Sequence, residues 1–286
     1  MKKEMNLLTC KLFDNHLHTE HSHDSKAPME KMKQAAIAQG LGGVAITEHC
    51  DMEHYHIIPV FEPTRASFRQ ATELREKYKN ELRIFTGVEI CETIWEPEAS
   101  DSFLRELPFD VIVGSVHAVR FAGETIPYSH IDFRTWTHDR MTAYLHQYFA
   151  DMIEMLHTTE FDILAHLTCP LRYMMCQTDY SFDFDEYRGE IREILSALIQ
   201  KGIALEVNTS SYRYGLPMAM PDEEILRMYR SMGGDRVSLA SDAHVPRDVG
   251  VPFDTAVALL RRCGFTHTVY FEKRVCHFVS IAQTEG

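Results

Sequence analysis

The sequence predicts an α/β fold in which helices cover both faces of a parallel β-sheet. Two observations support this fold class. Short runs rich in Val, Ile and Phe alternate with longer amphipathic segments along the 286 residues. Most of the short runs are continuously apolar, which is typical of parallel strands that are buried on both faces. The number of repeating βα units predicts either a barrel or a doubly wound sheet.

The expected strands are short, and most of them contain four to six residues. A late run at 267–271 is a candidate for an eighth strand. The first seven, in chain order, span residues 11–17, 43–47, 82–88, 109–114, 161–165, 203–207 and 236–240.

Six helices are expected between these strands, because apolar residues recur there at spacings of three and four. The first begins with Pro28 in its first turn and stops at Gly40, which are both common helix boundary signals. The helices span residues 28–39, 64–79, 138–157, 185–200, 221–232 and 253–263. No internal repeat, low-complexity tract or flexible linker interrupts them, so we expect one domain over residues 1–286.

The charge balance disfavours some classes of partner. The chain has 29 Lys and Arg against 42 Asp and Glu, a formal net charge of −13. This excess of negative charge disfavours binding to nucleic-acid backbone or to an anionic membrane. No apolar run approaches the roughly 20 residues that span a bilayer, and the N-terminal MKKEMNLLTCKLF lacks a signal-peptide pattern. We therefore expect a soluble, cytoplasmic protein.

The cysteines do not indicate a zinc ribbon or a redox dithiol. Seven of them occur, at positions 10, 50, 91, 169, 176, 263 and 276, and no two form a CxxC pair. We expect reduced thiols, because a chain of this size does not need disulfides to hold its core together.

The segment FDNHLHTEHSHDS at residues 13–25 contains four His and two Asp. It is either a solvated polar loop or one edge of a metal site whose other ligands lie further along the chain. Residues that can bind metals do close the other expected strands as well. In chain order these strand-end residues are His16 and His18, Glu48 and His49, Glu89, His117, His166, Asn208, and Asp242 with His244. Because the carboxyl ends of parallel barrel strands open onto one face, this recurrence favours the metal site.

The residue types narrow the class of metal. Histidine and carboxylate ligands without thiolate suit Zn, Mn, Fe or Co. His16 and His18 lie two positions apart on a strand and point the same way, so both can bind one ion. Glu89 has two oxygens and can bridge neighbouring ions. The nine or so candidate ligands exceed the number that one ion takes, which indicates two or three ions.

The order of these motifs resembles the PHP (polymerase and histidinol phosphatase) family. The resemblance covers residues 13 to about 250, and it rests on HLH at 16–18, TEH at 47–49, GVE at 87–89, SVH at 115–117, AH at 165–166 and SDAH at 241–244. It implies a distorted (β/α)7 TIM-like barrel with three divalent metal ions at the carboxyl ends of its strands.

The resemblance also implies which residues hold each ion. One ion would take His16, His18, Glu89 and Asp242. A second would share Glu89 and add His117 and His166. A third would take Asp24, His49 and His244. Position 24 is often His in the family and His23 is adjacent, but Asp24 has the matching spacing. Position 48 is commonly Asp and is Glu48 here, which we expect to support the ligands rather than to bind metal.

Such a centre predicts hydrolysis of a phosphate monoester, because closely spaced divalent ions activate water and screen phosphoryl charge. Glu89, Asp242 and His244 are the expected catalytic residues, and either Asp242 or His244 could protonate the leaving oxygen. The expected substrate-binding residues are His117, Arg172 and Arg213. Both arginines follow strand ends and are expected in loops, where a guanidinium can clamp a phosphate; the alternative is a surface arginine.

The stretch NTSSYRYGLPMAMPDEEIL at 208–226 resembles the histidinol-phosphatase branch of the family. The resemblance implies L-histidinol phosphate as the substrate, in histidine biosynthesis. The alternatives are a PHP phosphoesterase or exonuclease that acts on nucleotides, and a metal-binding protein without catalysis. Candidates for binding the imidazole and amino end of the substrate, unranked by the sequence, are Asp51, Glu53, His54, His56, Glu92, Tyr128 and His130.

Overall fold

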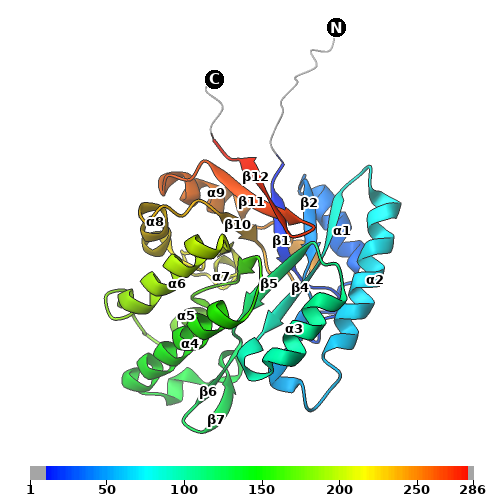
Figure 1. Cartoon of the computed structure of the whole chain (residues 1–286). Coiled ribbons are helices and arrows are strands. Elements are labelled where there is room, and N and C mark those ends of the chain that lie inside the picture. The colour runs from blue at the N-terminus through cyan, green and yellow to red at the C-terminus, as the bar shows by residue number, and fades with distance from the viewer. Residues whose placement is uncertain (1–10, 283–286) are drawn as a thin grey trace.

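Seven parallel strands form the centre of the protein in a computed structural model that describes residues 11–282 (Figure 1). Their order in the sheet is β1-β2-β4-β5-β8-β9-β10, and every neighbouring pair is parallel. Their bounds are Phe13–Leu17 (β1), Gly43–Ile46 (β2), Arg83–Cys91 (β4), Val111–Ser115 (β5), Ile163–Leu164 (β8), Ala204–Asn208 (β9) and Val237–Ala240 (β10). All seven expected strands are present, so the predicted α/β fold is confirmed.

The first and seventh strands meet at their carboxyl ends, which gives the sheet the form of an irregular TIM-like barrel. The contact is an isolated bridge between Leu17 and Ala243 rather than a continuous ladder. The Asn15 side-chain amide strengthens the junction by donating to the carbonyl oxygens of Leu239, at 3.2 Å, and Val269, at 3.1 Å. A buried side chain therefore replaces ladder hydrogen bonds where the barrel is distorted.

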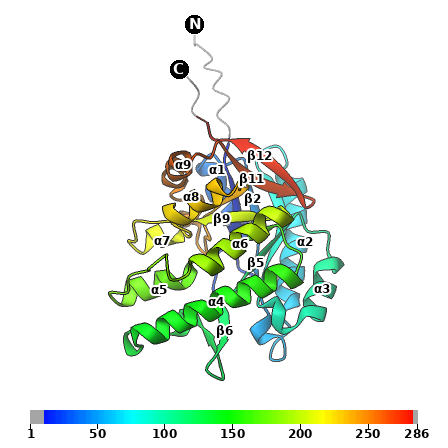
Figure 2. The ribbon, with the colours of Figure 1, turned by 60° about the vertical axis from the view of Figure 1, so that its left-hand side comes forward.

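Helices surround the strands (Figures 1 and 2). The six expected ones are α1 (Met29–Ala38), α2 (Phe61–Tyr78), α4 (His138–Thr158), α6 (Arg188–Lys201), α8 (Glu223–Ser231) and α9 (Phe253–Arg262). Three more were not predicted, namely α3 (Pro97–Glu106), α5 (Cys169–Gln177) and α7 (Ser210–Arg213). They have ten, nine and four residues, and length alone does not explain the omission, because α8 and α9 have nine and ten residues and were predicted.

Short elements extend the carboxyl ends of the strands. Strand β3 (His49–Asp51) pairs with the end of β4, and β6 (Ala118–Phe121) with β7 (Glu124–Pro127) forms a hairpin that projects at the end of the molecule opposite to β12 (Figure 1). None of these strands was predicted. The 3₁₀ helices are η1 (Met52–His54), η2 (Thr93–Trp95), η3 (Tyr128–His130), η4 (Phe133–Thr135) and η5 (Pro246–Asp248).

The amino-terminal end of the barrel is covered by the antiparallel hairpin of β11 (His267–Glu272) and β12 (Val275–Ser280). Strand β11 is the expected eighth strand and lies parallel to β10. Its Tyr270 ring stacks on Phe13 at 4.0 Å and joins an apolar cluster that includes Phe85, Val113 and Ile163. With this end filled by apolar side chains, polar groups gather at the opposite end of the strands.

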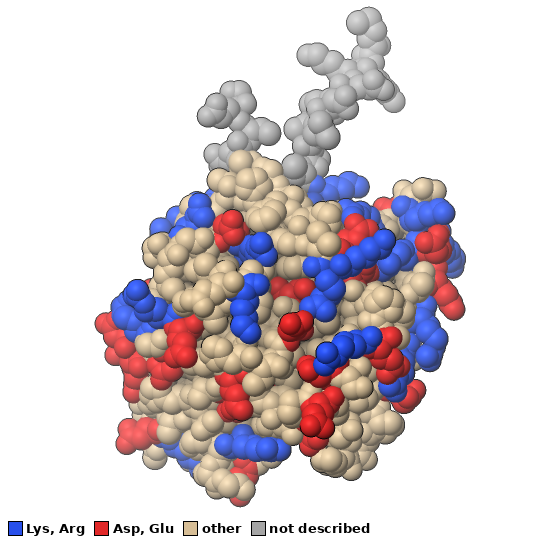
Figure 3. Space-filling model, viewed as in Figure 1, with Lys and Arg blue, Asp and Glu red and all other residues tan. Residues whose placement is uncertain are grey.

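The described residues agree with two other sequence expectations. The six described cysteines form no disulfide, while Cys10 lies outside the described residues. Within residues 11–282, no helix combines the length and the apolar character that crossing a membrane requires. On the face drawn in Figure 3, basic and acidic side chains are interspersed rather than gathered into a basic stripe. The assignment of the whole chain to one domain stays a prediction.

Candidate metal centre

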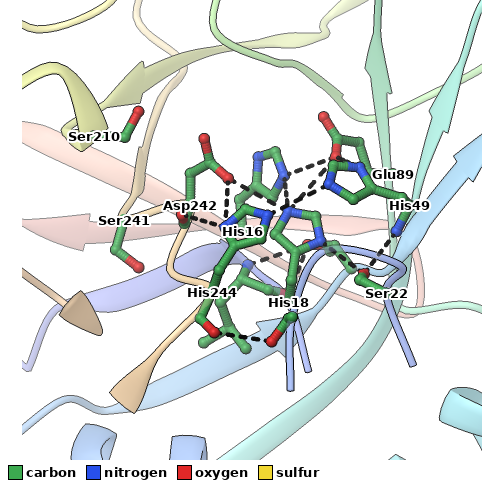
Figure 4. A network of polar contacts seen from close by, with 12 residues as sticks. His16, His18, Ser22, His49, Glu89, Ser210, Ser241, Asp242 and His244 are labelled. Carbon is green, nitrogen blue, oxygen red and sulfur yellow. Dashed lines mark hydrogen bonds and ion pairs between the residues drawn. The ribbon is translucent and has the colours of Figure 1, made fainter. Parts of the chain in front are cut away.

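Glu89 lies near the carboxyl end of β4 and contacts five of the other predicted ligands, and Figure 4 shows it beside His49. The five are His16, His18, His49, His117 and His166. The register of β3 and β4 places His49 directly beside Glu89 on the neighbouring strand. Glu89 Oε2 is 2.8 Å from His49 Nδ1 and 3.2 Å from His16 Nε2. Glu89 Oε1 is 3.1 Å from His117 Nε2 and 3.0 Å from His166 Nε2. Its two oxygens therefore face two different groups of ligands, as a bridging carboxylate requires.

The first group contains His16, His18 and Asp242 beside Glu89. The Nε2 atoms of His16 and His18 are 3.1 Å apart, and His18 Nε2 is 3.4 Å from Asp242 Oδ1. Strand β1 supplies the two histidines, and the turn after β10 supplies the aspartate. The barrel junction joins them, because Asp242 N donates to the carbonyl oxygen of His16 at 2.9 Å.

The third predicted group is also assembled. Asp24 Oδ2 lies 2.9 Å from His244 Nε2 and 3.5 Å from His49 Nε2. His23 instead points its Nδ1 toward Asp51 Oδ2 at 3.6 Å, and its side chain is 62% exposed. Of the two candidates at this position, the structure brings Asp24 to the other ligands.

These residues fit divalent ions by their donor set and by their spacing. Three pairs of imidazole nitrogens approach to 3.1, 3.3 and 3.4 Å. Two ligand atoms on a tetrahedral ion, each about 2.1 Å from it, lie about 3.4 Å apart. Among the described residues, Glu89 Oε2 and His49 Nδ1 are buried and make no hydrogen bond of good geometry, although they lie 2.8 Å apart. The four groups whose ligand atoms lie within 4.8 Å of one another are His16–His18–Asp242, His18–His49–His244, Glu89–His117–His166 and His49–Asp51–Cys91–His117.

The PHP domain model matches residues 14–210 of this chain. The chain belongs to the PHP domain family. A relative from Clostridium acetobutylicum named "probable histidinol-phosphatase" is 28% identical over 273 residues, covering 93% of this chain and 99% of the relative. A histidinol-phosphatase from Lactococcus lactis is 26% identical over 267 residues, covering 91% of this chain and 94% of the relative.

The fold of this PHP chain is similar to a solved structure of histidinol phosphate phosphatase from Lactococcus lactis, described as a complex with zinc, L-histidinol and phosphate. The TM-score is 0.75 at 23% sequence identity, and the match covers 93% of this chain and 99% of the other. The predicted barrel is thus also the fold of a related protein.

Hydrogen bonds on the far side of the imidazole rings orient the PHP ligands. His16 Nδ1 lies 2.8 Å from Glu206 Oε2, and His117 Nδ1 lies 3.0 Å from Asp51 Oδ1. His18 Nδ1 lies 3.1 Å from Ser22 Oγ. Each contact leaves Nε2 directed at the centre, which is how ligating histidines are usually held.

Glu48 supports the ligands, as its sequence position predicts. Its carboxylate accepts hydrogen bonds from Thr19 N at 3.0 Å, Ser22 Oγ at 2.6 Å and Ser67 Oγ at 3.0 Å. Because Ser22 also contacts His18, Glu48 acts on the centre through a serine.

Two buried acids of the site were missed by the sequence analysis. Glu206 on β9 is fully buried, and its Oε1 accepts from His166 N at 3.0 Å and Asn208 Nδ2 at 2.8 Å. Asp14 on β1 is also fully buried, and it accepts from Ser241 N at 2.9 Å. Burial raises the pKa of Asp14 to about 6. The signal for Glu206 is a single acid among the apolar residues of β9, whereas Asp14 stands beside Asn15 and His16 in β1 and has no such signal.

The charges of the ligands compensate one another in the metal-free protein. Burial opposes ionisation of Glu89, but the nearby imidazoles of His16 and His117 hold its pKa well below the ordinary value. Burial, together with His49 and His244, holds the pKa of His18 well below its ordinary value. His18 is therefore a neutral imidazole at physiological pH, the form that binds metals.

Two of the ligands have strained backbone conformations. His166 has φ of 24° and Asp242 has φ of 51°, both in the left-handed region that non-glycine residues rarely adopt. Such strain amounts to roughly 1–3 kcal/mol per residue and concentrates at functional sites. The left-handed backbone conformation changes the direction of the His166 and Asp242 side chains where each strand ends.

A cavity of about 220 Å³ opens beside the ligands, and Arg172 lies in its wall. Its guanidinium donates to Ser210 Oγ at 2.7 Å and to Tyr173 Oη at 2.8 Å. Predicted ligands in the same wall include His117, His166, Asp242 and His244. Arg172 is thus available to an anion that approaches the centre.

Arg213 has a different environment. It donates to the carbonyl oxygens of Ser241, at 2.6 Å, and Asp242, at 2.9 Å, and it is not among the cavity-lining residues. The expectation that Arg172 and Arg213 lie in loops was wrong, because they belong to α5 and α7. The substrate-binding role of Arg213 stays a prediction.

Proposed function

We propose that this protein is a metal-dependent phosphomonoesterase that converts L-histidinol phosphate and water into L-histidinol and phosphate in histidine biosynthesis. The observation that carries the proposal is the convergence of eight histidine and aspartate side chains around Glu89, beside a cavity that contains Arg172. The names of the relatives support the choice of substrate, as does the solved complex with L-histidinol and phosphate.

The proposed centre holds three divalent ions, with zinc, manganese or iron as the metals that suit its ligands. The ligands of the three sites are His16, His18, Glu89 and Asp242 for the first, Glu89, His117 and His166 for the second, and Asp24, His49 and His244 for the third. Bound ions of this class supply a nucleophilic hydroxide at neutral pH and neutralise the charge of phosphoryl oxygens.

The residues of the chain have distinct tasks in this proposal. Arg172 binds the phosphate dianion from the cavity wall, where its planar guanidinium matches two phosphate oxygens. Glu89 fixes the separation of the first two ligand groups through its two oxygens. Asp242 or His244, which both line the cavity, protonates the leaving alkoxide.

Phosphate release by the purified protein tests the proposal. The assay compares L-histidinol phosphate with mononucleotides and a labelled oligonucleotide, after loading with Zn, Mn or Fe and after chelation. We expect turnover of L-histidinol phosphate to exceed that of the nucleotides at least tenfold, to stop on chelation and to return with metal. Preferential cleavage of a nucleotide, or full activity in a proven metal-free protein, would contradict the proposal.

A further inference from the structure

Glu53 is a cavity residue whose chemistry the metal centre does not use. It belongs to η1, directly after β3, and it lines the same cavity as Arg172. Its side chain is only 10% exposed. Among the described residues, it is in none of the four groups that could hold a metal ion.

One oxygen of Glu53 has no hydrogen-bond partner within residues 11–282. Its Oε1 lies 3.1 Å from His54 Nε2, whereas its Oε2 is buried and accepts no hydrogen bond from the described residues. A buried carboxylate oxygen that accepts no hydrogen bond destabilises the folded protein, because it has lost its contacts with water. A cationic ligand in the cavity would remove this penalty by donating N–H groups to it.

The cavity is therefore asymmetric in charge. Arg172 enters from α5, which follows β8, and Glu53 enters from η1, which follows β3. Strands β4 and β5 lie between these two positions in the sheet. A molecule that spans the cavity meets a cation on one side and a buried anion on the other.

We propose that Glu53 binds the primary ammonium group of an amino-alcohol phosphate and thereby selects phosphomonoesters that carry a positive charge. The inference deepens the proposed function and rests on it. An ammonium group is charged throughout the neutral pH range, whereas an imidazole is mostly neutral there. An uncompensated buried charge is destabilising, so the Glu53 carboxylate is best paired with the ammonium group, which is always charged.

Three substrates and one isosteric variant test this role. The substrates are L-histidinol phosphate, 3-(imidazol-4-yl)propyl phosphate, which lacks the amine, and 2-aminoethyl phosphate, which lacks the imidazole. Glu53→Gln removes the charge and keeps the shape, and Glu124→Gln, at an exposed position of β7, is the matched control. Metal content and the thermal midpoint are measured for each variant, and binding of L-histidinol is measured by calorimetry.

We expect the wild type to prefer L-histidinol phosphate over its amine-free analogue by at least 30-fold in kcat/KM. Glu53→Gln should reduce this preference at least tenfold, mainly through KM, and weaken L-histidinol binding by a similar factor, while Glu124→Gln changes neither. A Glu53→Gln protein that is folded, metal-loaded and still fully selective for the amine would overturn the inference. If the wild type cleaves only 2-aminoethyl phosphate, in a Glu53-dependent way, the histidinol-phosphatase proposal fails and the ammonium site stands.

Discussion

At the scale of single residues, the cluster around Glu89 was predictable, and the residues that orient its imidazole rings were not. The nine predicted ligands stand in recognisable short motifs at or after strand ends, and the structure brings them together; their binding of metal stays a prediction. Glu206 is the one acid of β9, and Asp14 stands beside Asn15 and His16 in β1. In a sequence, an acid that faces the barrel interior and an acid at an edge of the sheet have the same signature. The contact of Glu206 Oε2 with His16 Nδ1 becomes visible only in the folded barrel.

Glu206 is expected to act as a positioning residue for two ligands. All its contacts are with donors or imidazole, namely His16 Nδ1, His166 N and Asn208 Nδ2. Glu206→Gln replaces one acceptor oxygen with an N–H donor, and we expect metal affinity to fall 10- to 100-fold. Chelator competition measures the affinity, and Glu193→Gln on the exposed face of α6 is the control. Unchanged metal affinity in Glu206→Gln would show that the contact is dispensable.

The proton donor can be assigned by varying the leaving group. A nitrophenolate leaves without protonation, whereas the alkoxide of L-histidinol needs a proton, and general acids typically contribute about 10²–10⁴-fold. We expect one of Asp242→Asn and His244→Gln to lose at least ten times more activity on L-histidinol phosphate than on p-nitrophenyl phosphate. The ratio of the two activities cancels any shared loss of metal. Equal losses on both substrates in both variants would place the donor elsewhere.

At the scale of elements, the seven strands of the parallel sheet and six helices were predicted, and several elements in the connections after the strands were not. The missed elements include α5, α7 and β3, which carry Arg172, Arg213 and His49. They lie directly after strand ends, in segments that the sequence analysis did not assign to a helix or a strand. The environment of the arginines was missed for the same reason.

The two arginines should respond differently to truncation. Arg172→Ala removes a cavity-wall cation, and we expect KM for the phosphate ester to rise at least tenfold with metal content unchanged. Arg213→Ala frees the carbonyl oxygens of Ser241 and Asp242, and we expect weaker metal retention as its main effect. Steady-state kinetics with parallel metal analysis separates the two, with Arg192→Ala on the exposed face of α6 as control. A KM increase in Arg213→Ala at full metal content would instead support the predicted phosphate clamp.

Strand β8 contains only two residues, and the Asp162 side chain extends its pairing. Asp162 Oδ2 accepts from Ile112 N at 2.8 Å and lies 2.5 Å from Arg274 Nε. Burial raises the pKa of Asp162 to about 6. The folded protein therefore binds a proton on Asp162 more tightly than the unfolded chain does. The contribution of this proton to the free energy of unfolding is present below about pH 4 and is lost as the pH rises to 6.

The Asp162→Asn variant should lack this dependence, because an amide does not titrate. We expect the free energy of unfolding of the variant, relative to wild type, to increase by up to about 3 kcal/mol between pH 4 and pH 7. Urea denaturation across this range measures the difference, and Asp254→Asn on the exposed face of α9 is the control. A difference that does not change with pH would exclude Asp162 as the titrating group.

At the scale of the whole molecule, the barrel brings residues more than 220 positions apart into one cluster. The seven parallel strands were predicted from the apolar runs and the distorted barrel from the family resemblance, but the contacts that join β1 to β10 were not predicted. Closure depends on Asn15, which donates to carbonyl oxygens of β10 and β11. The sequence alone does not show that an asparagine in one strand donates hydrogen bonds to residues more than 220 positions away.

Metal binding and folding stability should be linked, because the ligands converge only in the folded barrel. For an ion that binds only the folded state, free metal at 100 times its Kd adds about 2.7 kcal/mol to the free energy of unfolding. We expect the thermal midpoint to rise with Zn or Mn and to fall with chelator, as measured by calorimetry. A thermal midpoint that changes neither with metal nor with chelator would mean that the predicted ligands do not form a metal site.

The most direct test is a crystal structure of the metal-loaded protein with anomalous scattering measured at the edge of the bound metal. We expect anomalous peaks on both sides of Glu89, one among His16, His18 and Asp242 and one between His117 and His166, with a third beside Asp24. Glu89, His117 and Asp242 facing different sides of the molecule, or no peak next to Glu89, would contradict the account.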